Sequence, residues 1–419
     1  MTREYKNITV AGAGTAGYLA VAFLCKTFPD KSIRWIYPEV NNPIGVGEAT
    51  VPDVHIFLRK IGVSSEDILD HCKGTIKFGF RFDEFSGVKN KFFHAFPLYD
   101  EHCRQQRVTA GVLHPESDIG FHFNVNLLTT LIESKLQVYK NLSIIRKEVS
   151  FNDVRSTADL VVDCTGLSKT ILRAVEPNNN FVSIEQLIPN NSAYIYRHRY
   201  TNSLNQIQPY SIATAMKYGW IWNLFLRNEM TFGYVHSDSF DVRREFIDFI
   251  EHSTVSKIDE SKIKKIKFTT GRCKTHIVEG VPPVAAVGLS SSFVEPMEST
   301  SLFMSTFSIE LLCDYIKEKI TADEYNLMIN KEYNSIVSFI LAHYKYAKRS
   351  NEYWDRYKQM DVDLYSESAI FDEWSWNSLL TGLGIKEPSP RNLVEIAARK
   401  LDVSRGTPYP IWLRDYGYS

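Results

Sequence analysis

The amino-acid sequence predicts an α/β fold with a mixed or antiparallel sheet and a largely helical region intertwined with it. Three observations lead to this prediction. The chain opens with a strand, a glycine turn and a helix, and its middle contains segments in which apolar and polar residues alternate. Its last third places apolar residues three and four positions apart.

The opening segment, "NITVAGAGTAGYLAVAFLCKTFP", reads as a short β-branched strand, a glycine turn and a helix that stops before Pro29. "SIRWIYP" follows as a second strand, which completes the order of a Rossmann-like unit. Gly12, Gly14 and Gly17 form GxGxxG at the turn, where glycines allow close approach to a pyrophosphate and the helix N-terminus faces the phosphates. A purely structural turn is the alternative, but this context favours nucleotide binding.

Two further apolar strands end in turns, at "ADLVVDCTGLS" and "PVAAVGLSSSFVEP", and "IGVGEATVP" reads as a loop with a helix start. Three separated strand ends that close on one ligand suit an elongated dinucleotide such as FAD better than NAD. The usual position of the acidic ribose ligand holds Tyr37 and Pro38, so Glu39 is the candidate for that contact. The other candidate FAD contacts are Thr15, Ala16, Gly47, Glu48, Ala49, Thr50, Gly166 and Gly288.

The middle of the chain contains "SAYIYRHRY", "YGWIWNLFL" and "MTFGYVHSDSF", which alternate as antiparallel strands do. In a strand Trp220 and Trp222 share one face, and filling the core is the simplest reason for them. From about Ser301 the spacing becomes helical, and no internal repeat or low-complexity linker is present. We therefore predict an FAD-binding core with inserted antiparallel strands over residues 1–300. A helical region over residues 301–419 is expected to pack on this core and cover the substrate site.

The composition limits the partners of the protein. The chain has 48 Lys and Arg against 49 Asp and Glu without a long block of one sign, so small molecules are expected partners, and nucleic acid and membranes are not. The six cysteines are scattered without a CxxC pair, which predicts no metal site and a reducing compartment. The apolar run from Val10 to Cys25 is too short for a membrane span, and we expect a cytoplasmic protein.

Seven segments of the chain, taken in order, point to one family. They are "GAGTAGYLA", "GVGEATVP", "HFN", "DCTG", "GWIWNLFL", "GLSSSFVEPMESTS" and "HYKYAKRSNEYW". In their order and content the chain resembles the flavin-dependent tryptophan halogenase family over roughly Ile8 to Trp354. The tryptophan-x-tryptophan segment and the Glu-Ser-Thr turn make the resemblance specific, because GxGxxG alone is shared by many oxidoreductases.

The resemblance implies a free-standing enzyme that takes reduced FAD from a separate flavin reductase and uses oxygen to convert a halide ion into hypohalous acid. The acid then passes through an internal tunnel to an electron-rich aromatic substrate of the indole or phenol type. By the same resemblance Lys77 in "GTIKFGF" is the essential lysine, and Glu298 is the essential glutamate with Ser299 beside it. The backbone amides of Thr300 and Ser301 are the implied halide ligands. Without the resemblance, Lys77 reads as a solvated charge and Glu298 as a carboxylate at a helix start.

The chemistry explains these residue types. Hypohalous acid must be made in a closed pocket and held beside the substrate. Lys77 either donates a hydrogen bond to it or becomes a haloamine, and only the second role needs a neutral amine. We expect a nearby Glu298 to keep Lys77 charged, and to polarise the halogen donor, stabilise the cationic ring or take its proton. Trp220 and Trp222 would then form a partition that keeps the aromatic substrate from the flavin while a small halogen species passes.

The sequence also departs from the family pattern. The family usually continues from the second tryptophan to Ile-Pro, whereas Asn223 follows Trp222, so we expect the strand to run on. Ser301 stands where glycine is common, which predicts an altered halide site that favours bromide or iodide over chloride. The short region after the "HYKYAKRSNEYW" helix predicts a more open substrate site. A flavin-dependent aromatic monooxygenase or oxidase and a non-catalytic flavin-binding protein are the alternative functions, and a homo-oligomer is left open.

Overall fold

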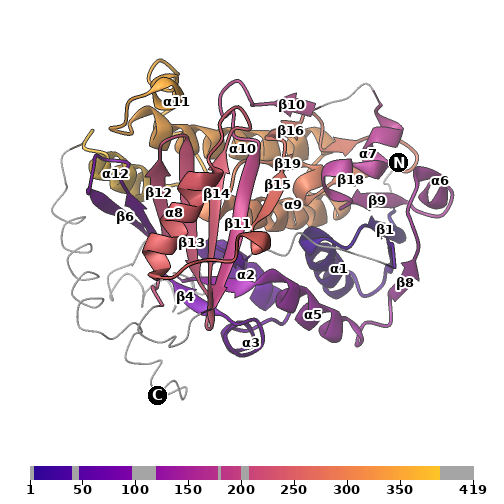
Figure 1. Cartoon of the computed structure of the whole chain (residues 1–419). Coiled ribbons are helices and arrows are strands. Elements are labelled where there is room, and N and C mark those ends of the chain that lie inside the picture. The colour runs from indigo at the N-terminus through magenta and orange to yellow at the C-terminus, as the bar shows by residue number, and fades with distance from the viewer. Residues whose placement is uncertain (1–3, 40–46, 97–118, 178–180, 200–206, 387–419) are drawn as a thin grey trace, which may run out of the picture.

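The computed structural model describes residues 4–39, 47–96, 119–177, 181–199 and 207–386. A six-stranded sheet lies at the right of Figure 1 and a seven-stranded sheet fills its centre and left. The α/β class predicted from the sequence is confirmed.

The six-stranded sheet consists of β1 (Asn7–Ala11), β2 (Ser32–Tyr37), β8 (Leu142–Arg146), β9 (Leu160–Asp163), β17 (Ile277–Val278) and β18 (Val284–Ala286). Its order is β17-β18-β9-β1-β2-β8, and all neighbours except β17 and β18 run parallel. Helix α1 (Thr15–Thr27) follows β1 directly and packs against α5 (Val125–Leu136). The predicted strand, glycine turn and helix are therefore present, and the turn lies at the carboxyl ends of the parallel strands.

The seven-stranded sheet consists of β5 (Gly79–Asp83), β6 (Lys91–Ala95), β11 (Ser192–Arg199), β12 (Ser211–Met216), β13 (Gly219–Phe225), β14 (Glu229–His236) and β15 (Lys264–Lys267). Its order is β15-β11-β14-β13-β12-β5-β6, and only β12 and β5 run parallel. Strand β13 continues through Asn223 to Phe225 as predicted. Because side chains alternate along it, Trp220 and Trp222 face the main core, while Ile221 faces the smaller core under α8 (Arg243–Thr254).

Two further sheets have three strands each. One is formed by β3 (Gly47–Ala49), β7 (Gly120–Asn124) and β4 (Thr75–Lys77), and the other by β10 (Phe181–Ser183), β16 (Gly271–Cys273) and β19 (Ser292–Phe293). Within the first, Lys77 pairs with Gly120 of β7. Asn124 ends β7, and its side chain accepts hydrogen bonds from the Asn126 and Leu127 amides, which starts α5.

The chain after residue 300 is largely helical as far as residue 386, with α9 (Thr300–Ile316), α10 (Ala322–Lys345), α11 (Glu352–Asp355) and α12 (Glu373–Gly382). The prediction of one helix over "HYKYAKRSNEYW" is wrong, because α10 ends at Lys345. The Asn351 side chain accepts hydrogen bonds from two amides of α11 and so starts a separate helix. The remaining helices are α2 (Pro52–Lys60), α3 (Ser65–His71), α6 (Phe151–Val154) and α7 (Thr170–Val175).

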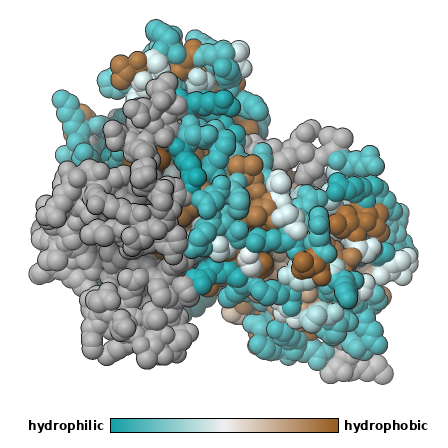
Figure 2. Space-filling model, turned by 90° about the horizontal axis from the view of Figure 1, so that it is seen from below, coloured by the Kyte–Doolittle hydropathy of each residue, from teal (hydrophilic) through white to brown (hydrophobic). Residues whose placement is uncertain are grey.

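One hydrophobic core joins the strands and the C-terminal helices, since Val10, Trp222, Leu312 and Leu383 belong to the same buried cluster. The division at residue 300 stays a prediction. The face in Figure 2 is hydrophilic over much of its described area, with hydrophobic residues in separate small groups. Over the described ranges, no helix is both long and apolar enough to cross a membrane. The cysteines described there are buried thiols, and Cys103 lies outside the described residues.

Candidate functional site

A cavity of about 600 Å³ is lined by residues that follow strands of the six-stranded sheet and by residues within strands of the seven-stranded sheet. The glycine turn contributes Gly12, Gly14 and Thr15, and the turn after β9 contributes Gly166. In Figure 1, α9 lies where the two large sheets meet. The glycine-rich turn, the turn after β9 and the seven-stranded sheet thus line one cavity.

Two observations show that the turn fits a dinucleotide. Gly12 has a φ of 101°, and a Cβ added there would come 2.4 Å from the Cys164 carbonyl oxygen, so only glycine suits this position. A Cβ added at Gly14 would meet nothing within 4 Å, because that residue faces the open cavity. Thr15 begins α1 beside it, so the amides at the helix N-terminus are available to phosphate groups.

The predicted cofactor residues divide into two groups. Gly12, Gly14, Thr15, Glu48, Ala49 and Gly166 line the cavity, whereas Ala16, Gly17, Thr50 and Gly288 are outside its lining. The surroundings of Gly47, the first residue of β3, lie outside what the structure describes. Gly288 supports the wall from behind, since a Cβ there would come 2.5 Å from the Ala16 Cβ.

The predicted ribose ligand is not at the cavity. Glu39 is exposed and outside the lining, which Pro38 joins instead. Beside the six-stranded sheet, the cavity is lined by the carboxylate of Glu148, two residues after β8. The sequence prediction placed the acidic ribose ligand after the second strand, β2. Strand β8 lies next to β2 and runs parallel to it, so the residues that follow β8 reach the same edge of the sheet.

Both tryptophans of the predicted partition line the cavity, with ring centroids 6.2 Å apart. Trp222 lies over Gly233 of the neighbouring strand, where an added Cβ would come 1.9 Å from the Trp222 ring. Trp220 is held differently, because its Nε1 donates a hydrogen bond of 3.0 Å to Glu295. The two rings thus form part of the cavity wall and are fixed by different contacts.

Lys77 lies beside this wall and has no exposed surface. Its Nζ donates to the Thr50 carbonyl at 3.0 Å and to the Ser299 hydroxyl at 3.1 Å, and it lies 3.5 Å from the Phe80 ring centroid. Burial lowers the pKa of Lys77 well below its usual value, although the Glu298 carboxylate acts in the opposite direction. The expectation that Glu298 would dominate is therefore reversed. A solvated lysine is also ruled out at this position.

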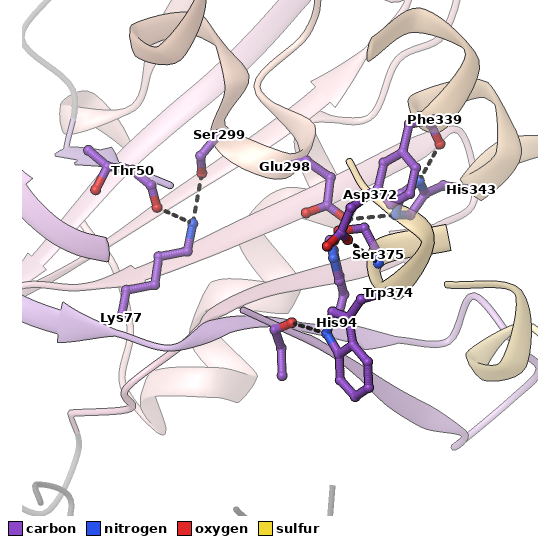
Figure 3. A network of polar contacts seen from close by, with 11 residues as sticks. Thr50, Lys77, His94, Glu298, Ser299, Phe339, His343, Asp372, Trp374 and Ser375 are labelled. Carbon is purple, nitrogen blue, oxygen red and sulfur yellow. Dashed lines mark hydrogen bonds and ion pairs between the residues drawn. The ribbon is translucent and has the colours of Figure 1, made fainter. Parts of the chain in front are cut away.

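One carboxylate oxygen of Glu298 is held by two histidines on the side away from Lys77 (Figure 3). This oxygen, Oε1, lies 2.9 Å from His94 Nδ1 and 3.0 Å from His343 Nε2. His343 Nδ1 lies 2.9 Å from the Phe339 carbonyl, which only accepts, so one further proton is shared between His343 and Glu298. Burial raises the pKa of Glu298, but the two histidines outweigh it and lower the pKa to about 2.

The second oxygen of Glu298 is the open position of this cluster. Glu298 Oε2 is buried and makes no hydrogen bond within the described part of the chain. A buried carboxylate oxygen is costly to leave unpaired, so it is available to a ligand or a reacting group.

The turn before α9 brings these groups together. Glu298 has a φ of 63° and Ser299 a φ of 58°, both in the left-handed region, which residues other than glycine rarely adopt. The turn directs Ser299 to Lys77 and Glu298 to the histidines, and α9 starts at Thr300. Ser301 lines the cavity, whereas the Thr300 residue is buried behind it.

Sequence reasoning missed His94, His343 and Glu295. "HYKYAKRSNEYW" contains His343 and "GLSSSFVEPMESTS" contains Glu295, so both segments were recognised without these residues being assigned a role. His94 had no signal in the sequence. Among the described residues, no group of three or more His, Cys, Asp or Glu side chains is arranged so that it could hold a metal ion.

Comparison with known proteins identifies the family. The family model for tryptophan halogenases matches residues 7–126 and 130–398. Tryptophan 6-halogenase SttH of Streptomyces toxytricini is 25% identical over 93% of this chain and 92% of the relative. Tryptophan 7-halogenase RebH of Lentzea aerocolonigenes is 23% identical over 86% of this chain and 80% of the relative.

Solved structures show the same fold. A flavin-dependent halogenase from Xanthomonas campestris superposes with a TM-score of 0.80 at 20% identity and covers 99% of both chains. BrvH, a flavin-dependent halogenase from Brevundimonas, superposes with a TM-score of 0.78 at 20% identity over 99% of both chains. Since the family model also matches most of its length, this chain belongs to the tryptophan halogenase family of flavin-dependent enzymes.

Proposed function

We propose that this enzyme makes hypohalous acid in the cavity and passes it to Lys77, where it halogenates an electron-rich aromatic compound of the indole or phenol type. One observation carries the proposal. The fully buried amine of Lys77 is hydrogen-bonded to Ser299, which lines the cavity, while Lys77 itself is outside the lining. The Lys77 amine is thus separated from the cavity by one layer of residues, to which Ser299 belongs.

The cavity suits FAD. Gly12, Gly14 and Thr15 would hold the pyrophosphate, and Glu148 is the candidate ribose contact. Bound reduced FAD, together with oxygen, supplies the oxidising chemistry that turns halide into hypohalous acid. We propose that a separate flavin reductase delivers the reduced cofactor.

Trp220 and Trp222 support the separation of two chambers. Their rings lie in the cavity wall and exclude a bulky aromatic substrate, whereas a hypohalous acid molecule is small enough to move along the turn toward Lys77. This exclusion favours halogenation over hydroxylation, because a hydroxylase must bring its substrate to the flavin.

Lys77 and Glu298 have complementary roles in this proposal. Lys77 holds the halogen species by hydrogen bonding or as a haloamine, and its lowered pKa makes the neutral amine of the second route more accessible. The unpaired Oε2 of Glu298 stabilises the cationic ring and takes its proton as the halogen replaces it. Activity that needs a charged amine falls as the pH rises through the lowered pKa, whereas activity that needs the neutral amine rises.

The aromatic substrate is assigned to the space next to the unpaired Oε2 of Glu298, beside the histidine cluster that holds Oε1. Phe371 stacks on Phe339 with centroids 3.9 Å apart and lies 6.3 Å from His94, so aromatic surface is already concentrated there. Trp374 of α12 donates a hydrogen bond to the Ala95 carbonyl, which holds the C-terminal region against β6. The helical region can thus cover a planar substrate.

The halide site is assigned to the amides of Thr300 and Ser301 at the start of α9, where the helix N-terminus favours an anion. With serine in place of the usual glycine, we propose a preference for bromide or iodide over chloride. A relative in structure, Tar14, is described as a chlorinase, so the preference needs a direct comparison of the three halides.

The test is incubation with FAD, a flavin reductase, NADH, bromide and a panel of indoles and phenols, followed by mass spectrometry. Bromine incorporation supports the proposal, added oxygen indicates a monooxygenase, and no product indicates a non-catalytic flavoprotein. Lys77→Ala should abolish halogenation while peroxide formation continues. Lys345→Ala is the control, because Lys345 Nζ also donates to a backbone carbonyl, that of Met360, but outside the cavity.

A further inference from the structure

Glu295 is a fully buried carboxylate with no role in the reaction proposed above. It lies on the segment that leads to the Glu298 turn and is outside the cavity lining. Its Oε1 accepts hydrogen bonds from Trp220 Nε1 at 3.0 Å and from the Tyr344 hydroxyl, and its Oε2 accepts one from Asn190 Nδ2 at 2.6 Å. Both oxygens are thus engaged, and one of the donors is an indole of the cavity wall.

The donors come from separate parts of the chain. Trp220 belongs to β13, Tyr344 to the last turn of α10, and Asn190 to the segment before β11. Tyr353 of α11 extends the cluster by donating to Asn190 Oδ1 at 3.0 Å. These side chains are all buried. The carboxylate therefore connects the cavity wall to the helices α10 and α11.

The two tryptophans differ in how their orientation is fixed. Trp222 Nε1 has no hydrogen-bond partner in the described part of the chain, and its ring is placed by its fit over Gly233. The Trp220 Nε1 has a directional bond to Glu295, which defines the plane and the rotation of the indole. Loss of that bond would leave Trp220 to turn within its pocket.

We propose that Glu295 is a positioning residue that fixes the Trp220 indole in the cavity wall and makes the seal of that wall depend on the docking of α10 and α11. The proposal rests on the proposed function, because it takes Trp220 to be part of the partition. Glu295 does not touch the cavity and acts through Trp220. Its three donors are neutral groups, so it serves as an acceptor of hydrogen bonds and pairs with no cation among the described residues.

The first test measures the ratio of hydrogen peroxide to halogenated product in Glu295→Leu, Glu295→Gln, Trp220→Phe and the Glu295→Leu/Trp220→Phe double variant. Glu295→Leu should raise the ratio at least about 5-fold at unchanged FAD affinity, while Glu295→Gln, which keeps an acceptor for the indole, should raise it less. Trp220→Phe has no N–H, so the double variant should equal Trp220→Phe. Additive effects of the two substitutions, or an unchanged ratio in Glu295→Leu, overturn the proposal.

Glu332 provides the control for general damage to the fold. It is also a buried glutamate, it lies on α10, and it accepts hydrogen bonds from Ser368 and the Ala369 amide away from the cavity. Glu332→Leu should lower the thermal stability without changing the peroxide ratio. An equal rise in that ratio in Glu332→Leu would overturn the proposal, because any loss of a buried carboxylate would then suffice.

A second readout needs no halogenation and separates this inference from the proposed function. The near-ultraviolet circular dichroism of Trp220 is the spectrum of the protein minus that of Trp220→Phe. It should change when the same difference is taken in the Glu295→Leu background and stay nearly unchanged in the Glu295→Gln background. An unchanged spectrum in Glu295→Leu rejects the positioning role even if the enzyme halogenates. A changed spectrum supports it even if no halogenated product forms.

Discussion

Glu295 and Glu298 are two buried carboxylates three residues apart, and their environments give them opposite properties. Neutral donors surround Glu295, and burial raises its pKa to about 7 although Asn190, Tyr344 and Trp220 lower it through hydrogen bonds. Two histidines surround Glu298, and they lower its pKa to about 2 against the effect of burial. Burial alone therefore does not set the charge of a carboxyl group, and the partners decide it.

The difference extends to what each group can do. Both oxygens of Glu295 accept hydrogen bonds, so it has no free position for chemistry. Glu298 keeps Oε2 unpaired and stays ionised over the whole neutral range. One short segment thus supplies a carboxyl group that holds the cavity wall and another that can act on a substrate.

The largest expected effect is the difference in halogenation rate between the Glu298 and Glu295 variants. Glu298→Gln should lower the halogenation rate by about 10³-fold, because it removes the negative charge and the proton acceptor. Glu295→Gln should lower it by less than about 10-fold, since it keeps the acceptor for Trp220. Steady-state rates at saturating FAD and bromide measure both. An equal loss of halogenation rate in the two variants would contradict the idea that the hydrogen-bond partners of Glu295 and Glu298 decide which of them acts on the substrate.

The second prediction concerns the partners of Glu298. His343→Leu should lower the free energy of unfolding by about 3 kcal/mol, because the buried Glu298 carboxylate loses one of its two hydrogen-bond partners. The Glu298→Gln/His343→Leu double variant should regain part of that loss, since no buried charge then remains. Urea unfolding at neutral pH measures both. If the loss of unfolding free energy in the double variant equals the sum of the losses in the two single variants, Glu298 and His343 are not energetically coupled.

The third prediction uses the pKa of Glu295. Its carboxyl group has a pKa of about 7 when folded against 4.5 as the reference value, so the folded state keeps the proton to higher pH. Its ionisation penalty therefore grows as the pH rises between these values, and stability should fall by about 2 kcal/mol from pH 5 to pH 8. In Glu295→Gln the part of the fall that Glu295 contributes should be absent, whereas the part from Glu48 should remain, because burial raises the pKa of Glu48 to about 7 as well. Glu298 has the opposite sign, since its stabilisation is present above pH 4.5 and is lost as the pH falls toward 2.

The smallest expected effect concerns Trp222, whose ring is held by its fit over Gly233 and not by a hydrogen bond. Gly233→Ala should lower the free energy of unfolding by about 1.5 kcal/mol and raise peroxide release, because the added methyl group displaces the Trp222 ring. Gly280→Ala is the control. A Cβ added at Gly280 would come no closer than 3.2 Å to its nearest neighbour, the Pro282 carbonyl oxygen. If the two variants leak peroxide equally, the fit of Trp222 over Gly233 does not contribute to the seal.

Local sequence patterns predicted the elements around the cavity. The β1–α1 turn depends on Gly12 and its neighbours, and the shared face of Trp220 and Trp222 depends only on the period of a strand. The same patterns could not place Lys77. Its burial depends on β7 pairing beside it and on Ser299, which is 222 residues away in the chain.

The histidine cluster shows the same limit. His94 lies 204 residues and His343 lies 45 residues from Glu298 in the sequence, and no spacing rule relates them. The expected effect of Glu298 on Lys77 failed for a related reason, because the burial of Lys77 lowers its pKa by more than the Glu298 carboxylate raises it. Residue types therefore suggested the reaction, while the tertiary structure determines the protonation of its groups.

A crystal structure with bound FAD and bromide would show whether the flavin and Lys77 occupy separate spaces. We predict an isoalloxazine ring against Trp220 and Trp222, a buried Lys77 amine separated from that ring by the wall, and an anomalous bromide signal at the amides of Thr300 and Ser301. An isoalloxazine ring in direct contact with Lys77 Nζ, with no indole between them, would contradict it.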